Sequence, residues 1–344
     1  METKLDPHKY EDRYKCTIRG IENSKISTRN KKLIFRFKDD CVRDGLTKAR
    51  IIKLMDTMKC IAIIFDKDLD KVTKRDVQRF VTYVQENEKF GVWTKAAYKV
   101  ILKKFYKWLK GNSETYPEEV RWVKTNINKN LIRLPAESGL LTEDDIKLLI
   151  NNAEHPRDKA FIALLYESGC RVGGLLTLKL KNLTFDEHGV LINVIGKTGS
   201  RQVRIISSTQ YIATWISNHP LKNDLESPLW VNYGNCNFNK LMTYDAVLRL
   251  LQRLFDKCGI KKRFNPHLFR HSRATFLANH LTEFQMNQYF GWVQGSGMPA
   301  TYVHLSGKET ESVLLALNGV KIDKEEKESS LKPIKCPRCD NINS

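Results

Sequence analysis

The sequence has no long hydrophobic run. Its uncharged apolar stretches, such as residues 61–65, are far shorter than the roughly 18 residues that a membrane-spanning helix needs. The first fifteen residues are charged from the second position onward and hold no apolar core of a signal peptide. We therefore expect a cytoplasmic protein that does not bind membranes.

The sequence also lacks the paired cysteines of a disulfide framework. Six of its eight cysteines are scattered singly through apolar or mixed segments, which favours free thiols in a reducing compartment. The other two, Cys336 and Cys339, form the Cys-Pro-x-Cys pair of a zinc knuckle. Tetrahedral zinc takes four ligands, so this pair is half of a site. A zinc ion there, a site completed by another molecule and a metal-free remnant all remain open, and we favour the remnant.

Acidic residues are too few to balance the basic ones, and the imbalance is concentrated at one end. The formal net charge is +19, and residues 1–110 hold 28 Lys and Arg against 15 Asp and Glu. Residues 141–320 hold 20 against 15. A basic first third predicts a polyanionic partner, and nucleic acid is the leading candidate.

A chain of 344 residues is long enough for two domains. Residues 1–112 show helical periodicity without strand-like alternation, which predicts an all-helical domain. Residues 113–138 have no clean period and indicate a linker. Within residues 139–320, helical patterns surround two apolar, β-branched segments in residues 188–207, joined by a glycine-containing turn. The predicted fold class is therefore mainly α with a small antiparallel β-sheet, followed by a charged tail at residues 321–344.

Lysines recur at intervals of four in the last helical pattern of the first domain. They are Lys95, Lys99, Lys103 and Lys107. A solvated basic surface is an equally simple interpretation for any one of them. Because no acidic residue lies between them, the row favours contact with DNA phosphates.

The stretch "NPHLFRHSRA" at residues 265–274 gathers two histidines and two arginines within seven positions. Like charges at helical spacing repel one another unless an anion lies against them. His267 and Arg270 are three residues apart and share a helix face. The stretch therefore predicts an anion-binding site. His271 and Arg273 are assigned to packing or to contact with a DNA backbone.

Four further segments carry residues of chemical interest in a fixed order. Arg171 lies in "SGCRVGGLLTL", Lys197 in "VIGKTGSRQV", Trp292 in "YFGWVQ" and Tyr302 in "ATYVHL". Each alone is ordinary. Together with the His-x-x-Arg formed by His267 and Arg270, they resemble the catalytic domain of the tyrosine recombinases, which include phage integrases and chromosome-dimer-resolving recombinases. The resemblance covers about residues 140–318, and the basic helical third resembles the core-binding domain of that family.

This resemblance implies a site-specific DNA recombinase or integrase of a prokaryote, acting at the nucleoid. It would cleave and rejoin strands through a 3′-phosphotyrosine intermediate, which stores the bond energy so that no cofactor is needed. Tyr302 would attack the phosphate. A phenol with a pKa of about 10 is only about 0.1% ionised at neutral pH, so its proton must be removed or shared. His267 would assist, either as base or as hydrogen-bond donor to a phosphate oxygen.

The remaining residues of the resemblance would stabilise charge in the transition state. Arg171 and Arg270 would clamp the non-bridging oxygens, because guanidinium forks suit phosphate geometry. Lys197 would protonate the departing 5′-oxygen, and Trp292 would donate its indole N–H to the phosphate. The implied partners are double-stranded DNA and further copies of the chain, a tetramer formed by exchange of the apolar segment at residues 309–319. A final core helix is the alternative for that segment, and we favour docking.

One position departs from the family pattern. Relatives usually carry an acidic residue three positions after the first arginine, and this chain has Gly174. Whether nearby Glu167 takes its place is open. Gly174 supports one alternative to the recombinase hypothesis, a DNA-binding recombinase homologue with weakened catalysis. The other alternative is a DNA-relaxing enzyme similar to type IB topoisomerases, which use a similar set of catalytic residues.

Overall fold

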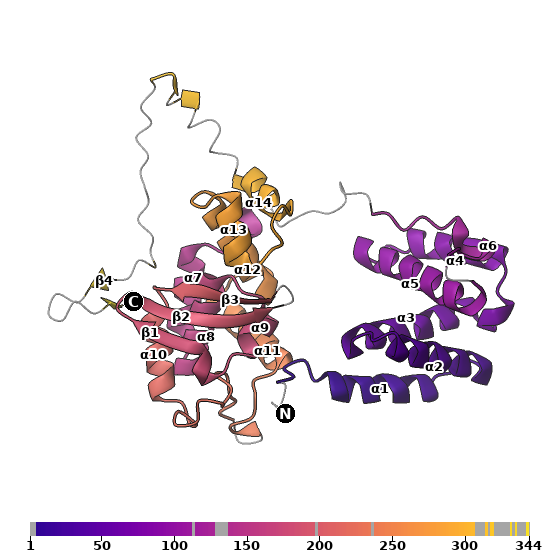
Figure 1. Ribbon diagram of the computed structural model, residues 1–344, viewed down its shortest axis with the longest axis horizontal. Coiled ribbons are helices and arrows are strands. Elements are labelled where there is room, and N and C mark those ends of the chain that lie inside the picture. The colour runs from indigo at the N-terminus through magenta and orange to yellow at the C-terminus, as the bar shows by residue number, and fades with distance from the viewer. Residues whose placement is uncertain are drawn as a thin grey trace. The chain divides into compact units, whose positions relative to one another are not determined.

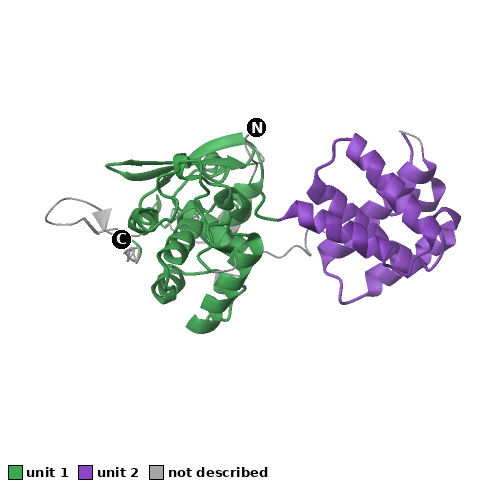
Figure 2. Cartoon of the chain, turned by 90° about the horizontal axis from the view of Figure 1, so that it is seen from below, with its two compact units in different colours: residues 1–8, 135–344 green, residues 9–134 purple. Residues whose placement is uncertain are grey.

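The computed structural model describes residues 5–111, 114–127, 137–196, 199–234, 237–306, 314–315, 317–319, 331, 334–335 and 342–343. The chain forms two compact units (Figures 1 and 2). Unit 2 comprises residues 9–134, and unit 1 comprises residues 1–8 and 135–344. Each is described by itself.

Unit 2 is built from helices. They are α1 (Tyr10–Glu22), α2 (Thr28–Arg43), α3 (Lys48–Phe65), α4 (Lys74–Glu86), α5 (Val92–Lys110) and α6 (Glu118–Arg121), with a 3₁₀ turn at Leu69–Lys71. Thr73 and Asp76 cap α4 reciprocally, as their spacing predicts. The core gathers around α3, and Phe37 packs against Phe105 at 5.3 Å between ring centroids. Part of the predicted linker also packs here, because Val120 and Val123 are buried in this core.

Unit 1 surrounds a small sheet with helices (Figure 1). Its helices are α7 (Glu143–Asn152), α8 (Pro156–Ser168), α9 (Val172–Leu176), α10 (Thr209–Ser217), α11 (Tyr244–Cys258), α12 (Pro266–Ala278), α13 (Glu283–Phe290) and α14 (Met298–Ser306), with 3₁₀ turns at Glu137–Gly139 and Leu180–Asn182. The antiparallel sheet has the order β1 (Leu183–Asp186), β2 (Gly189–Gly196) and β3 (Gly199–Ile205). A separate pair joins β4 (Ile334–Lys335) to β5 (Ile342–Asn343).

The predicted fold class, mainly α with a small antiparallel sheet, is confirmed. The two predicted strands are β2 and β3, and they pair from Val190 opposite Ile205 to Gly196 opposite Gly199. Strand β1 was not predicted. It is four residues long and mostly exposed, so it carries little of the alternating pattern that indicates a strand.

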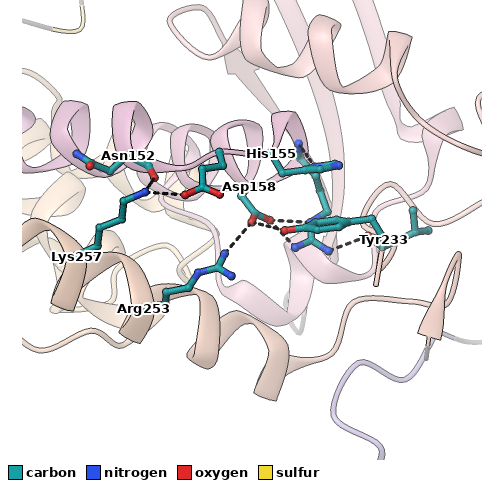
Figure 3. A network of polar contacts seen from close by, with 9 residues as sticks. Asn152, His155, Asp158, Tyr233, Arg253 and Lys257 are labelled. Atoms are coloured by element: carbon teal, nitrogen blue, oxygen red, sulfur yellow. Dashed lines mark hydrogen bonds and ion pairs between the residues drawn. The ribbon is translucent and has the colours of Figure 1, made fainter. Parts of the chain in front are cut away.

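Helix α8 runs through the core of unit 1 and is held at its first turn by a buried polar network (Figure 3). The carboxylate of Asp158 is 1% exposed and accepts hydrogen bonds from Arg157 Nε at 2.9 Å and Tyr233 Oη at 3.0 Å. Arg253 of α11 adds an ion pair at 3.4 Å, and the ring of His155 stacks on Tyr233. A buried carboxylate needs such partners. The network fixes α8, whose other end leads directly into Gly169, Cys170 and Arg171.

The first described residues pack on unit 1 ahead of the helices of unit 2. The carbonyl of Pro7 accepts a hydrogen bond from the backbone N–H of Tyr244 at 2.9 Å. The ring of His8 lies 5.1 Å from the ring of Tyr244, measured between centroids. Lys9 then adopts a positive φ of 50° as α1 begins. We call Pro7 and His8, with their contacts to Tyr244, the N-terminal strap.

Candidate active site

Arg270 is fixed by the carboxyl ends of two helices. Its Nη1 donates to the carbonyl of Gly169, the C-cap of α8, at 2.7 Å, and its Nη2 donates to the carbonyl of Phe290, the last residue of α13, at 2.9 Å. Helix C-termini carry partial negative charge, so they hold a cation without neutralising it. Among the described residues no carboxylate forms an ion pair with Arg270. Its charge therefore remains available to an anion.

Other cations surround this guanidinium. Burial, followed by the charges of Arg171 and Arg201, lowers the pKa of Arg270 to about 10. Arg171 is the N-cap of α9, and its side chain is exposed. Positive charges held this close without counter-ions raise the free energy of the site until an anion binds. The cluster thus has the electrostatics of a phosphate site.

Tyr302, on α14, lies beside this cluster. It is 2% exposed, and its ring stacks on Trp292 with centroids 5.5 Å apart and an interplanar angle of 9°. Trp292 in turn stacks on Phe290, and the Arg270 guanidinium lies 5.3 Å from the Trp292 ring centroid. Burial raises the pKa of Tyr302, and the charges of Arg270 and Arg171 act in the opposite direction. The phenol is therefore protonated at neutral pH.

The phenol of Tyr302 contacts a histidine that the sequence reasoning left out of the catalytic set. Tyr302 Oη lies 2.9 Å from His271 Nδ1, on α12. His267, one turn earlier, has its ring centroid 6.5 Å from that of His271, and its side chain is exposed. Desolvation by the surrounding protein, followed by the charges of Arg270 and Arg171, lowers the pKa of His267. No hydrogen bond joins His267 to Tyr302 in the described part of the chain.

Arg201, on β3, is a second residue that the sequence reasoning missed. Its Nη2 donates to Cys170 Sγ at 3.2 Å, directly before Arg171. It also reaches the residue before Trp292, because a Cβ built on Gly291 would lie 2.3 Å from Arg201 Nη1. Its Nε is buried with no hydrogen-bond partner among the described residues. An arginine on a strand next to a turn carries no signal of this role in one sequence.

The space beside Gly174 is occupied by Val194 of a neighbouring strand. A Cβ at Gly174 would lie 3.0 Å from Val194 Cγ1 on β2, so a side chain there would displace Val194. Glu167 does not replace the missing acid. Its carboxylate points to the turn after β3 and accepts from the backbone N–H groups of residues 206, 207 and 208 at 2.7, 3.0 and 2.7 Å.

The remaining predicted residues of this site lie elsewhere or outside the described residues. Lys197 falls between the ends of β2 and β3 and outside the described residues, as do Cys336 and Cys339. Arg273 packs inside the protein, where its Nε donates to the carbonyl of Glu167 at 3.2 Å. In the described ranges, no group of three or more His, Cys, Asp or Glu is placed to hold a metal.

The four lysines of α5 differ in exposure and in their contacts. Lys99 is 7% exposed, and burial lowers its pKa. Lys103 Nζ donates to the carbonyl of Val123 at 3.0 Å and lies 4.4 Å from the Tyr116 ring centroid, with Lys107 Nζ 5.2 Å from the same centroid. Lys95 donates to the carbonyl of Gln85 at 2.6 Å. Four residues turn a helix by about 400°, so each lysine lies about 40° further round than the one before.

A phenol beside guanidinium groups that form no ion pair within the described ranges has the chemistry needed for nucleophilic attack on a phosphodiester. Residues 140–309 match the Phage integrase family. The chain is 26% identical over 251 residues to a tyrosine recombinase of Pseudothermotoga lettingae, covering 73% of this chain and 84% of that protein. The domain at residues 140–309 is thus similar to the phage integrase family and to tyrosine recombinases. The expected tyrosine-type DNA strand transferase is thereby confirmed.

Solved structures share the fold. The XerH site-specific recombinase in a post-cleavage complex with a palindromic difH substrate has a TM-score of 0.62 at 18% identity, covering 92% of this chain and 100% of that chain. A lambda integrase tetramer bound to a Holliday junction has a TM-score of 0.61 at 14% identity, covering 81% and 78%. In the described part of this chain, no helix is both long and apolar enough to span a bilayer.

Proposed function

We propose that this protein is a site-specific DNA recombinase in which Tyr302 attacks the scissile phosphate. The placement of Arg270 carries the proposal. Its guanidinium donates to two carbonyls and, among the described residues, pairs with no carboxylate, so it keeps its charge for a phosphate beside Tyr302, whose pKa it lowers. Attack joins Tyr302 Oη to phosphorus and breaks the bond to the 5′-oxygen. The 3′-phosphotyrosine formed is opened by a 5′-hydroxyl in the reverse reaction, so no cofactor is consumed.

The other predicted residues stabilise the developing charge and supply the proton for the leaving group. Arg171 and Arg270 neutralise the non-bridging oxygens as charge develops, a contribution typically worth several kcal/mol. Lys197 protonates the departing 5′-oxygen, and His267 donates a hydrogen bond to the phosphate. Trp292 walls off water, since its ring lies between those of Phe290 and Tyr302.

Uncovering of the phenol oxygen precedes the attack, because the side chain of Tyr302 is 2% exposed and a DNA phosphate has to reach that oxygen. The segment before α14 contains Gly295, with a φ of +76°, and Gly297. Such residues absorb changes in backbone angles, which supports a hinge at this point.

The first test is a covalent trap. Nicked suicide duplexes made from the flanks of the chain's own gene are incubated with the protein, with Tyr302→Phe as control. We expect a protein–DNA adduct that the control does not form. Absence of an adduct on every duplex would favour the DNA-binding homologue. Relaxation of any supercoiled plasmid without strand exchange would favour the topoisomerase.

Unit 2 is proposed to contact the DNA backbone through Lys95, Lys99, Lys103 and Lys107. Loss of one phosphate contact lowers the slope of log affinity against log salt by about 1. We expect this change in Lys95→Gln and Lys107→Gln, and a smaller one in Lys99→Gln, because Lys99 is 7% exposed. Unchanged slopes in all of them would remove the row from the interface.

Assembly is proposed to follow the lambda integrase tetramer, with double-stranded DNA at its centre. Residues 309–319 would dock on a neighbouring copy, and most of them lie outside the described residues. Deleting residues 309–344 should leave binding to a single site intact and abolish the tetramer on paired sites. Analytical ultracentrifugation with DNA measures both.

Zinc at Cys336 and Cys339 is the least supported part of the proposal, because two further ligands would have to come from elsewhere. Metal analysis of the purified protein, with Cys339→Ser as control, tests it. A DNA substrate also supports a cytoplasmic, nucleoid-associated location in a prokaryote, which a fluorescent fusion would reveal.

A further inference from the structure

Two histidines stand one turn apart on α12, and only His271 touches the nucleophile. The distance from His271 Nδ1 to Tyr302 Oη is 2.9 Å, and the two rings are 5.9 Å apart at 33°. Direct contact at hydrogen-bond distance is the first requirement of a general base. His267 does not meet it in this arrangement, although its family position invites that role.

We infer that His271 is the general base that takes the phenolic proton of Tyr302. This inference rests on the proposed function, in which Tyr302 is the nucleophile. The proton moves from Oη to Nδ1 as the bond from Oη to phosphorus forms, and the 5′-oxygen leaves with a proton from a separate acid. In rejoining, the 5′-hydroxyl attacks, and the departing Tyr302 recovers its proton from His271.

The surroundings keep His271 in the form that accepts a proton. The groups that face it are His267 and Arg270 from its own helix and Tyr302 from α14. Burial, followed by His267 and Arg270, lowers the pKa of His271. A lowered pKa keeps the imidazole neutral at pH 7. With its hydrogen on Nε2, Nδ1 then offers a lone pair to the phenol.

The same cations favour ionisation of the Tyr302 phenol. Arg270 and Arg171 lower the pKa of Tyr302 against the larger effect of burial, and a bound phosphate would bring the guanidinium groups to the reacting oxygen. Proton transfer to His271 places a further positive charge on α12 while negative charge accumulates on the phosphate. The two charges therefore develop together, so the transfer is favoured in the transition state and not in the resting protein.

The test compares two substitutions of His271. One keeps the hydrogen bond to the phenol but not the ability to accept its proton, and the other removes both. In His271→Gln the side-chain oxygen accepts a hydrogen bond from Tyr302 but does not take its proton, whereas His271→Ala removes both abilities. His280→Gln, at an exposed position just after α12, is the matched control. Thermal melts establish that each variant is folded. The readout is the single-turnover rate of adduct formation on the nicked suicide duplex.

We expect His271→Gln and His271→Ala to slow adduct formation by about 10²-fold or more at pH 7, the usual contribution of a general base. The rate of both variants should rise about tenfold per pH unit toward the pKa of the phenol, while the wild type levels off above the pKa of His271. Replacing Tyr302 with difluorotyrosine, whose phenol is more acidic, should restore most of the lost rate. It should not restore His267→Gln.

The outcomes separate this inference from the proposed function. If the wild type forms no adduct, the proposed function fails. If the wild type reacts and His271→Gln reacts within about threefold of it, His271 only holds the tyrosine and the inference is overturned. A loss in both His271 variants that neither alkaline pH nor the fluorinated phenol relieves would also overturn it.

Discussion

Replacing Arg270 by lysine tests whether this side chain joins two helices. The substitution keeps the positive charge but offers one nitrogen in place of two. Nη1 and Nη2 now bridge the carbonyls of Gly169 and Phe290, at 2.7 and 2.9 Å, and the single nitrogen of a shorter, unforked side chain cannot occupy both positions, so we expect one of the two bonds to be lost. Loss of a hydrogen bond from a charged donor costs about 1.5–3 kcal/mol. Unit 1 has roughly 200 residues, so this corresponds to a fall in Tm of about 3–12 °C.

The assay is urea unfolding, followed by tryptophan fluorescence, with the midpoint and slope compared between Arg270→Lys and wild type. Arg204→Lys, on the same sheet as Arg201, is the control, because Arg204 is a partly exposed residue paired with Asp186 at 2.6 Å. A pair of this kind contributes at most about 1 kcal/mol. If Arg270→Lys and Arg204→Lys unfold at the wild-type midpoint, the bridging role of Arg270 is refuted.

Three further substitutions test the surroundings of the site. Glu167→Gln should destabilise the protein by about 2–4 kcal/mol in thermal melts, because its amide cannot accept all three backbone N–H groups that the carboxylate accepts. Gly291→Ala should slow adduct formation, since its Cβ would lie 2.3 Å from Arg201 Nη1 at a φ of +60°; an unchanged rate would argue against a role for Arg201. Gly174→Glu should lower the Tm, and adding Val194→Ala should recover part of the loss, because the two side chains compete for one space.

The sequence was most informative where local order decides the structure. Helical periodicity predicted the helices of unit 2, and the β-branched segments around a glycine turn predicted β2 and β3. The order of chemical residues led to Arg270, Trp292 and Tyr302, and the structure brings these together.

What could not be predicted depends on packing between distant segments. The contact of His271 with Tyr302 requires α12 and α14 to pack side by side, and spacing along α12 alone favours His267 just as well. The unequal exposure of the α5 lysines has the same cause. Lys99 lies between Lys95 and Lys103 around the helix and is nevertheless buried, so its burial depends on packing that the row of lysines did not reveal.

The N-terminal strap has a consequence for the order in which the protein folds during synthesis. Residues 9–134 form a compact unit of their own, so unit 2 has all its partners soon after it leaves the ribosome. Pro7 can take its place only after Tyr244 has been synthesised, because the carbonyl of Pro7 accepts a hydrogen bond from the backbone N–H of Tyr244. At about 5–20 residues per second the first segment of the chain stays unpaired for roughly 10–50 s. Pro7 is thus placed later than the helices of unit 2 that follow it in the chain.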